Sequence, residues 1–293
     1  METIALSFDI EDWFCVQNMK GVHPFKTWNS LELRVVESTR YILSQLKNRD
    51  IKATFFILGW IAEKVPDLVR EIAHAGHEIA SHGYSHLPIT QMQPNEFERD
   101  LDRSLNVLYK ITTTQIKGYR APSFSITEKT LWAFKILKKY HIKYDSSIYP
   151  TRHPDYGIPH FKQKIQIIDE IIEFPMTSCS LLGMPLPVSG GGYFRLFPYP
   201  LYKHLLKRAT ANGSPPVAYF HPWEFDSNQP RVKISPFKRF RHYTGLKGNR
   251  QKFERFISEF DFSSLDLILD SLINCSQLHQ DKNLVKDLLE LQY

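Results

Sequence analysis

Over the first half of the chain, short apolar runs alternate with longer stretches in which apolar residues recur every three or four positions. A short apolar run bounded by polar or turn residues is typical of a buried strand, and the longer spacing indicates a helix with one buried face. Strands that alternate with helices predict a parallel sheet or barrel. We expect strands or strand ends in residues 3–8, 52–59, 78–81, 117–123 and 142–147, and helices in residues 31–47, 61–75, 95–108 and 128–140.

The pattern changes after Pro150, where prolines and aromatic residues become more frequent. The three glycines at residues 190–192 are either a flexible turn or a cradle of backbone amides for an anion. We favour the turn, because no Lys-Ser/Thr pair follows as it does in a phosphate-binding loop. Here we expect strands in residues 171–175 and 217–224, and helices in residues 200–212, 253–272 and 284–291.

Acidic and imidazole side chains stand where the expected strands end. Asp9, Glu11 and Asp12 come at or just after the end of the first strand, His82 follows the third, and His221 lies near the end of the late strand. The carboxyl ends of parallel strands meet at one edge of an α/β sheet or barrel, which is where functional sites collect. We therefore expect the functional site at this edge.

His82 and His86 lie four positions apart, with Gly83 between them and Pro88 after them. The glycine, the neighbouring serines and the proline favour a loop over a helix. A loop can still bring two imidazoles to one ion, and borderline divalent metals favour imidazole ligands. Such a site needs a third ligand, usually a carboxylate. The competing interpretation is a pair of surface histidines without a metal.

The net charge of +6 comes from basic residues that are spread along the 293-residue chain. Their densest run is residues 233–252, which is either a patch for an anionic partner or a solvated loop. We favour the solvated loop, and we expect no nucleic-acid partner.

Cys15, Cys179 and Cys275 are odd in number and far apart, so they form neither a disulfide framework nor a paired-cysteine metal motif. This cysteine usage fits a reducing compartment. A cluster of acidic residues begins at Asp9, before any hydrophobic region of a secretory signal, and no apolar run approaches the roughly 18 residues of a membrane span. We therefore expect a cytoplasmic protein without a transmembrane segment.

Short motifs follow one another in a recognisable order. They are Ser7-Phe8-Asp9 with nearby acids, His82-Gly83-Tyr84-Ser85-His86, Gly118-Tyr119-Arg120-Ala121-Pro122, Asp145, and Phe220-His221-Pro222. Together they resemble the polysaccharide deacetylases, which are carbohydrate esterase family 4 and carry the NodB homology domain. The resemblance covers about residues 4–225.

Two later segments resemble the extension found in deacetylases of exopolysaccharide gene clusters. They are Ser189-Gly190-Gly191-Gly192-Tyr193-Phe194-Arg195 and Phe220-His221-Pro222-Trp223-Glu224. The resemblance implies an α/β fold, a distorted (β/α) barrel formed by residues 1–225. A C-terminal helical extension, residues 226–293, is expected to pack on the barrel.

Removal of an N-acetyl group from a sugar is amide hydrolysis, which needs a nucleophilic water, a base, an oxyanion stabiliser and an acid for the departing amine. A divalent metal can supply the nucleophile and stabilise the oxyanion. The resemblance implies that Asp9 is the base and His221 the acid. It also implies that Arg120 pairs with Asp9 and keeps it ionised, and that Asp145 orients His221.

The resemblance makes both loop histidines metal ligands, with an acid as the third. The family usually has two adjacent aspartates, whereas Ile10 follows Asp9 here. The metal acid is then Glu11, which shares a face with Asp9 if the strand continues, or Asp12, which needs the chain to turn first. An Asp-x-Asp spacing in some relatives favours Glu11. Two imidazoles and one carboxylate suit Zn, Co or Ni, and we expect Zn.

Pro122, Ser123 and Trp223 are the expected contacts to the sugar. The family often has a Tyr after the proline, whose backbone N–H helps to hold the oxyanion. Ser123 takes that place here, so the amide can still serve while the side-chain contacts differ. Trp223 neighbours His221 and is the aromatic residue that we expect to stack on a sugar ring.

The resemblance implies metal-dependent hydrolysis of the N-acetyl group of an amino sugar, in a polysaccharide or its precursor, with release of acetate. One alternative is hydrolysis of a cyclic amide, as in the allantoinase-like branch; that branch can lack the full metal set, so the intact residues count against it. Another is a non-catalytic carbohydrate-binding protein, against which the joint presence of acid, base and ligands argues. The expected partner is an N-acetylated saccharide.

Overall fold

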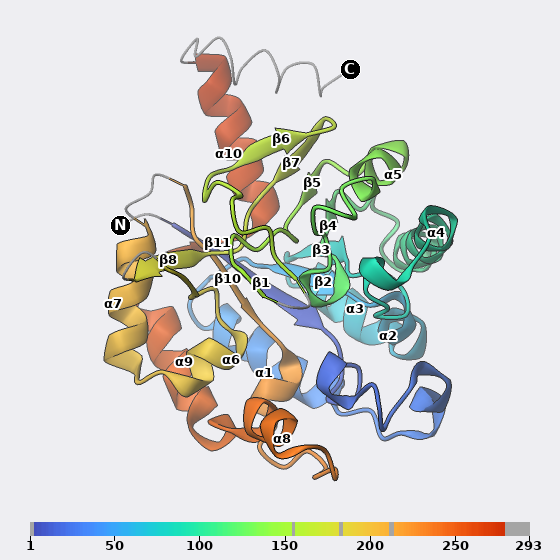
Figure 1. Cartoon of the computed structure of the whole chain (residues 1–293), viewed down its shortest axis with the longest axis vertical. Coiled ribbons are helices and arrows are strands. Elements are labelled where there is room, and N and C mark those ends of the chain that lie inside the picture. The colour runs from blue at the N-terminus through green and yellow to red at the C-terminus, as the bar shows by residue number, and fades with distance from the viewer. Residues whose placement is uncertain (1–2, 154–155, 182–183, 211–213, 279–293) are drawn as a thin grey trace.

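The structure is a computed structural model, which describes residues 3–153, 156–181, 184–210 and 214–278. Its centre is a nine-stranded sheet in the order β10-β1-β2-β3-β4-β5-β7-β6, with β11 also paired to β1 (Figure 1). Every pair in this sheet is parallel except β6 with β7. The strands are β1 (Ile4–Ile10), β2 (Thr54–Ile57), β3 (Glu78–Ser81), β4 (Gly118–Tyr119), β5 (Tyr144–Asp145), β6 (Gln166–Ile168), β7 (Ile171–Glu173), β10 (Val217–Phe220) and β11 (Phe262–Ser263), and the separate pair is β8 (Ser178–Leu181) with β9 (Met184–Pro187).

Helices surround this sheet in Figure 1, and most of them connect one parallel strand to the next. The α-helices are α1 (Val35–Lys47), α2 (Gly59–Lys64), α3 (Pro66–His74), α4 (Pro94–Thr112), α5 (Ala133–Lys139), α6 (Gly191–Leu196), α7 (Tyr199–Thr210), α8 (Pro236–Tyr243), α9 (Leu246–Glu259) and α10 (Leu265–Leu278). Short 3₁₀ helices are η1 (Gln17–Met19), η2 (Phe25–Ser30), η3 (Ile89–Gln91), η4 (Pro122–Phe124) and η5 (Pro222–Phe225).

The expected distorted α/β barrel is confirmed as a curled, mostly parallel sheet whose path runs from β10 to β6. All seven residues of β1 are buried, as a central parallel strand covered on both faces requires. Aromatic rings fill the space behind it: Phe8 stacks on Phe55 at 5.0 Å, and Phe220 of β10 contacts Phe253 of α9 at 5.2 Å between ring centroids. Helix α9 therefore packs directly against the sheet.

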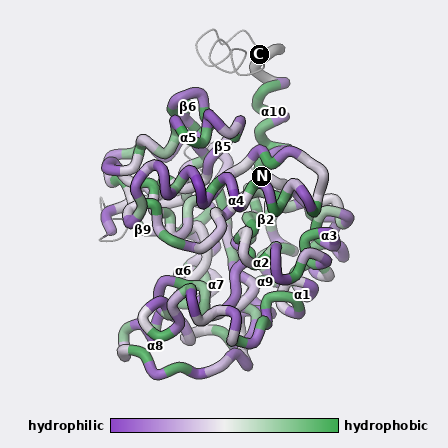
Figure 2. Tube along the Cα trace, turned by 90° about the vertical axis from the view of Figure 1, so that its right-hand side faces the viewer, coloured by the Kyte–Doolittle hydropathy of each residue, from purple (hydrophilic) through white to green (hydrophobic). Residues whose placement is uncertain are grey.

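The surface helices bury one stripe each. In α4 the buried positions are Phe97, Leu101, Ser104 and Leu108, spaced three or four apart as the sequence pattern predicts. Figure 2 shows the same change between hydrophobic and hydrophilic residues along α3 and α10.

The prediction of one continuous helix over residues 253–272 is wrong. Helix α9 ends at Glu259, β11 pairs with β1, and α10 begins at Leu265. The break is held by groups far away in sequence: Leu265 N–H donates to Thr54 Oγ1 (2.8 Å), and Asp266 N–H donates to Glu78 Oε2 (3.1 Å). These acceptors satisfy the first N–H groups of α10, so tertiary contacts override the continuous apolar periodicity.

The helix expected over residues 61–75 is divided at Val65, because Pro66 starts α3 at its first position. The helix expected over residues 284–291 lies outside the described residues. Among the described residues, no helix has both the length and the apolar character needed to cross a bilayer. The sheet continues past residue 225 through β11, and the domain boundary expected there stays a prediction.

Candidate active site

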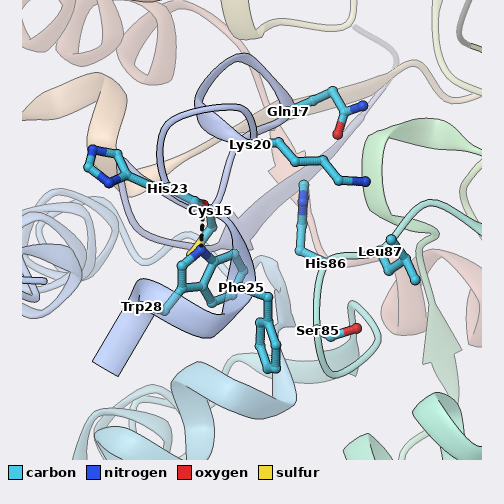
Figure 3. A pocket seen from close by; sticks show the side chains of 9 residues that line it. All are labelled: Cys15, Gln17, Lys20, His23, Phe25, Trp28, Ser85, His86 and Leu87. Atoms are coloured by element: carbon cyan, nitrogen blue, oxygen red, sulfur yellow. Dashed lines mark hydrogen bonds between the residues drawn. The ribbon is translucent and has the colours of Figure 1, made fainter. Parts of the chain in front are cut away.

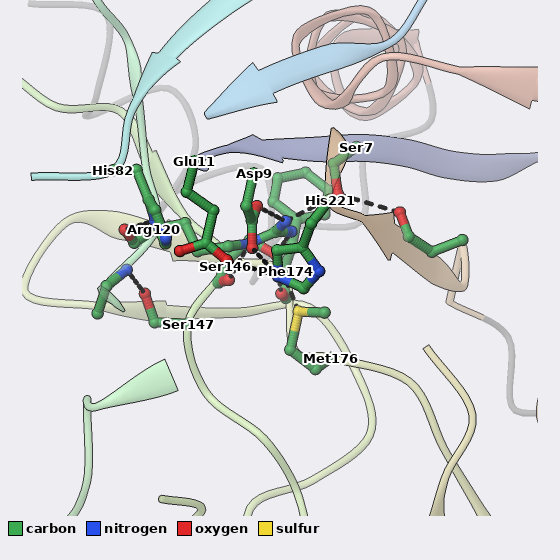
Figure 4. A network of polar contacts seen from close by, with 12 residues as sticks. Ser7, Asp9, Glu11, His82, Arg120, Ser146, Ser147, Phe174, Met176 and His221 are labelled. Atoms are coloured by element: carbon green, nitrogen blue, oxygen red, sulfur yellow. Dashed lines mark hydrogen bonds and ion pairs between the residues drawn. The ribbon is translucent and has the colours of Figure 1, made fainter. Parts of the chain in front are cut away.

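The predicted site residues gather at the carboxyl edge of the sheet. Asp9 belongs to β1, His82 follows β3, Arg120 follows β4 and His221 follows β10, and these strands lie in the neighbouring order β10-β1-β2-β3-β4. Figure 4 shows their side chains converging on one point together with Glu11. Residues far apart in sequence thus meet because parallel strands end at the same edge.

The chain turns directly after β1, and this turn decides which acid faces the histidines. Glu11 follows the last strand residue, Ile10, and its N–H donates to the carbonyl oxygen of Asp9 (3.0 Å); Asp9 and Glu11 are each 2% exposed. Asp12 turns away: its carboxylate accepts the backbone N–H groups of Arg34 (2.7 Å) and Val35 (3.0 Å) at the start of α1. Burial raises the pKa of Asp12 to about 6, against the effect of these hydrogen bonds. Of the two open alternatives, the structure brings Glu11 to the histidines and uses Asp12 as a helix cap.

Glu11, His82 and His86 form a candidate metal centre. One ligand atom from each lies within 4.8 Å of the others, and all three residues are buried. His82 Nδ1–H donates to the carbonyl oxygen of Arg120 (2.8 Å), which leaves Nε2 as the ring nitrogen with a free lone pair. His86 Nε2 lies 2.9 Å from Glu11 Oε2.

The donor atoms fit a divalent cation. Among the described residues, the buried Glu11 Oε2 accepts no hydrogen bond of acceptable geometry, although it lies against His86 Nε2. Burial alone would raise the pKa of Glu11, but His86 and the other nearby histidines lower it to about 2. Burial lowers the pKa of His82 to about 4. An ionised carboxylate and a neutral imidazole are the forms that bind metals.

Asp9 is held by a fully buried arginine. Arg120 Nη1 donates to Asp9 Oδ1 (2.7 Å) and to Ser7 Oγ (2.8 Å), while Nε donates to the carbonyl oxygen of Ser146 (2.9 Å). The guanidinium lies over the ring of Phe56 at 4.1 Å from its centroid. The predicted Asp9–Arg120 pair is therefore present and has a single defined geometry.

His221 lies close to the carboxylates of both Asp9 and Glu11. Its Nε2 lies 3.4 Å from Glu11 Oε1 and 3.8 Å from Asp9 Oδ2, and its Nδ1 lies 3.1 Å from Glu224 Oε2. Burial opposes the charged form, but Glu224 and then Glu11 and Asp9 raise the pKa of His221 to about 9. The ring is therefore held in its protonated form at neutral pH, as an acid that donates a proton must be.

Asp145 does not contact His221 as predicted. Its carboxylate accepts the N–H (2.9 Å) and the hydroxyl (2.7 Å) of Ser147, and it pairs with the buried Glu173. Ser147 Oγ in turn accepts the N–H of Ala121 (2.7 Å), so Asp145 supports the loop after Arg120. Asp145 thus occupies the position expected from the family, but its side chain contacts Ser147 and Glu173 instead of His221.

Glu224 is the residue that sequence reasoning missed. It lies three positions after His221, and its side chain returns to the backbone N–H of His221, as in a capping box. That spacing was a signal, since an acid at the third position after a helix-start residue is a common cap. Arg195 was also missed as a site neighbour, and it pairs with Glu224 at 2.8 Å.

The expected sugar contacts line the cavity around the cluster. Ser123 has a positive φ of 56° and lines a cavity of about 120 Å³ together with Gln17 and Trp223, while Pro122 is buried beside it. Trp223 is only 7% exposed, because its ring stacks on His242 at 4.4 Å. Its stacking on a sugar ring stays a prediction.

Two further cavities adjoin this one and share its lining. Gln17 lines all three, and sequence reasoning did not single it out. Figure 3 shows the mainly apolar one, about 150 Å³, between Trp28, Phe25 and His86. The other, about 460 Å³, is more polar, and the Lys20–Gln91 hydrogen bond joins the walls of the two.

A curled α/β sheet with this set of acids and histidines at its carboxyl edge defines the polysaccharide deacetylase class. Residues 2–144 match the family described as polysaccharide deacetylase, and residues 146–270 match one described as Domain of unknown function (DUF3473). The polysaccharide deacetylase family is thus assigned to residues 2–144, just under half of the chain.

Curated relatives match the same half. The peptidoglycan-N-acetylglucosamine deacetylase of Bacillus cereus is 37% identical over 99 residues, which are 33% of this chain and 36% of that protein. The peptidoglycan-N-acetylmuramic acid deacetylase PdaA of Bacillus subtilis is 25% identical over 135 residues, 46% of this chain and 50% of that protein. The matched region thus spans half or less of these relatives.

A solved structure extends the likeness to most of the chain. The structure of a polysaccharide deacetylase candidate from Mycobacterium smegmatis has a similar fold. The superposition covers 92% of this chain and 90% of that chain, with a TM-score of 0.58 and 19% sequence identity. At this identity the likeness concerns the fold. Assignment to the exopolysaccharide-cluster type stays a prediction.

Proposed function

We propose that this protein hydrolyses the N-acetyl group of an amino sugar, in a polysaccharide or its precursor, and releases acetate. The observation that carries the proposal is the convergence of Asp9, His221 and the Glu11–His82–His86 centre at one edge of the sheet. The names of the relatives from Bacillus cereus and Bacillus subtilis, both N-acetyl-sugar deacetylases of peptidoglycan, support the same reaction class.

Each group has a distinct task in amide hydrolysis. Asp9 takes a proton from the attacking water, and Arg120 holds the carboxylate in place at 2.7 Å. His221, protonated at neutral pH, gives a proton to the nitrogen as the C–N bond breaks. The backbone N–H of Ser123 is our candidate donor to the oxyanion. The products are acetate and a free amine, and the proton accepted by Asp9 replaces the one that His221 gives up.

The candidate metal ligands would contribute by holding an ion that stabilises negative charge in the transition state. A divalent ion held by Glu11, His82 and His86 would polarise the acetyl carbonyl and lower the pKa of water. The ligand set favours Zn, with Co and Ni as alternatives of similar chemistry. His82 is oriented for this task by its hydrogen bond to the Arg120 carbonyl, which links the metal side of the site to the base side.

The test is metal content together with acetate release, measured on N-acetylated oligosaccharides of chitin and peptidoglycan type. We expect about one divalent ion per chain in the wild type, with both ion and acetate release lost in His82→Ala. His74→Ala, an exposed histidine in the last turn of α3, is the matched control and should change neither.

Two other results would redirect the proposal. Metal binding without acetate release, joined to turnover of a cyclic amide, would assign the alternative reaction. Saccharide binding that is equal with and without chelator, and no acetate, would indicate a binding protein. The cytoplasmic location expected from the sequence is tested separately, by fractionation of cells that carry the native gene.

A further inference from the structure

A buried ion pair lies directly behind the imidazole of His221. Arg195 Nε donates to Glu224 Oε1 at 2.8 Å, and the two side chains are 2% and 1% exposed. Both residues end a segment that the sequence singled out, residues 189–195 and residues 220–224. The structure thus joins these two motifs through their last residues.

Glu224 holds His221 at two points. Its Oε2 accepts the backbone N–H of His221 at 3.0 Å and lies 3.1 Å from the ring Nδ1. With Nδ1 engaged in this way, the ring presents Nε2 to the carboxylates of Asp9 and Glu11. A single carboxylate therefore sets both the backbone position and the ring orientation of the proposed acid.

Arg195 in turn leaves Glu224 little freedom. Besides Glu224, it donates to the carbonyl oxygens of Arg241 (2.9 Å), His242 (3.0 Å) and Thr244, at the C-terminal end of α8. A planar guanidinium with this many fixed acceptors has one orientation. The C-terminal end of a helix also favours a positive charge.

The glycine run explains how Arg195 reaches this position. Gly190 has φ 137° and forms a parallel bridge with Tyr219 of β10, and a Cβ there would lie 2.1 Å from the Tyr219 carbonyl oxygen. Only glycine allows this approach, which seats α6 beside the strand that leads to His221. The run is therefore a close-packing element of the scaffold.

We propose that Glu224 is the positioning residue for His221, and that Arg195 holds Glu224 in place. On this view, the segment over residues 146–270, matched to a domain of unknown function, supplies the proposed acid together with the groups that orient it. It completes the site that residues 2–144 begin. The inference rests on the proposed deacetylase function, in which His221 protonates the leaving amine.

The first test is Glu224→Gln in the full chain. The amide keeps the size of the side chain, but it cannot accept from both His221 and Arg195 as the carboxylate does. We expect kcat for acetate release to fall about 100-fold, within the range of general acid catalysis, while KM changes less than about threefold. Metal content should be unchanged, because Glu224 is outside the candidate metal centre. Glu224→Asp, which keeps the charge, should recover part of the loss.

A double-mutant cycle separates positioning from structural support. In a His221→Ala background, Glu224→Gln should cost little further activity, since residues that act as one unit are not additive. Losses that multiply in the double variant would overturn the proposal. The matched control is Glu259→Gln, which breaks an ion pair with Lys203 and Arg255 in the same segment and should leave kcat unchanged.

A spectroscopic readout keeps the inference testable if no saccharide is deacetylated. In histidine-labelled wild-type protein, the Nδ1 proton of His221 should appear as a hydrogen-bonded signal, assigned by its loss in His221→Ala. Glu224→Gln should shift or remove this signal, and Glu259→Gln should not. An unchanged signal in Glu224→Gln would overturn the positioning role, whereas absence of acetate release by the wild type counts only against the proposed function.

Discussion

The guanidinium of Arg120 lies 2.7 Å from the carboxylate of Asp9, and the two side chains are 0% and 3% exposed. Removing one partner of such a pair leaves an uncompensated charge inside the protein, which costs far more than loss of a surface pair. The Asp9–Arg120 pair is therefore both a feature of the proposed chemistry and a condition of the fold.

Arg120→Met should lower the free energy of unfolding by about 3–5 kcal/mol, because Asp9 is then buried without its counter-charge. Denaturant unfolding measures this change. Arg40→Met is the matched control: Arg40 pairs with Glu71 at the surface, where its side chain is 56% exposed, so its removal should change the free energy of unfolding far less. Equal losses in the two variants would contradict the buried-pair interpretation.

Substitutions of Glu11 and of Asp12 should differ in their effect on metal binding. Glu11→Gln should remove most of the bound divalent ion, because the amide lacks the negative charge of the ligand. Asp12→Asn should keep it, since Asp12 caps α1 through the N–H groups of Arg34 and Val35. Elemental analysis after dialysis compares the two changes, which are chemically identical. A comparable metal loss in Asp12→Asn would return the ligand assignment to Asp12.

The parts of this site that could be predicted from sequence are those that depend on strand ends. Asp9, His82 and His221 follow apolar runs, and a parallel sheet brings the ends of such runs together whatever the details of the helices. The preference for Glu11 over Asp12 came from the Asp-x-Asp spacing of some relatives and not from strand periodicity, because β1 ends at Ile10, one residue before Glu11. Local pattern and general topology were enough to place the strand ends.

The partners of the site residues depend on contacts that no local pattern contains. Whether Asp145 or Glu224 faces His221 depends on the direction in which β5 ends and on the η5 turn that follows β10. The break between α9 and α10 likewise depends on acceptors in β2 and β3, about two hundred residues away. Apolar periodicity carries no information on such hydrogen bonds.

Trp223 should act on the metal centre through Glu11. Its indole Nε1–H donates to Glu11 Oε1 at 3.2 Å, while its ring stacks on His242. Trp223→Phe keeps an aromatic ring but removes the donor, and we expect metal affinity to fall about 10-fold, as for other groups that orient a ligand. A competition titration with a chromophoric chelator measures the affinity.

Trp132→Phe, at the start of α5, is the control for this change and should leave metal affinity unchanged. A Trp223→Phe variant with unaltered metal affinity but a higher KM would contradict the predicted link to Glu11. It would instead support the sugar-stacking role inferred for Trp223 from the sequence.

The buried pair of Asp145 and Glu173 should make stability depend on pH. Burial raises the pKa of Glu173 well above its usual range, and the neighbouring Asp145 raises it further. The folded chain then holds a proton that the unfolded chain releases above a pH of about 4. The contribution of Glu173 to the free energy of unfolding is therefore complete below that pH. It is lost as the pH rises through the folded pKa, by up to about 1.4 kcal/mol per pH unit.

Glu173→Gln should remove this dependence. Glu173 Oε1 accepts the N–H of Ile148 at 2.9 Å, while the buried Oε2 accepts no hydrogen bond among the described residues, so an amide N–H there can donate to Asp145 as the proton does. Urea unfolding from pH 4 to pH 8 should show a flatter profile and greater stability than wild type at the alkaline end. Glu170→Gln, whose exposed carboxylate pairs with Lys138, should retain the wild-type slope. Parallel profiles for wild type and Glu173→Gln would mean that the pair holds no extra proton in the folded state.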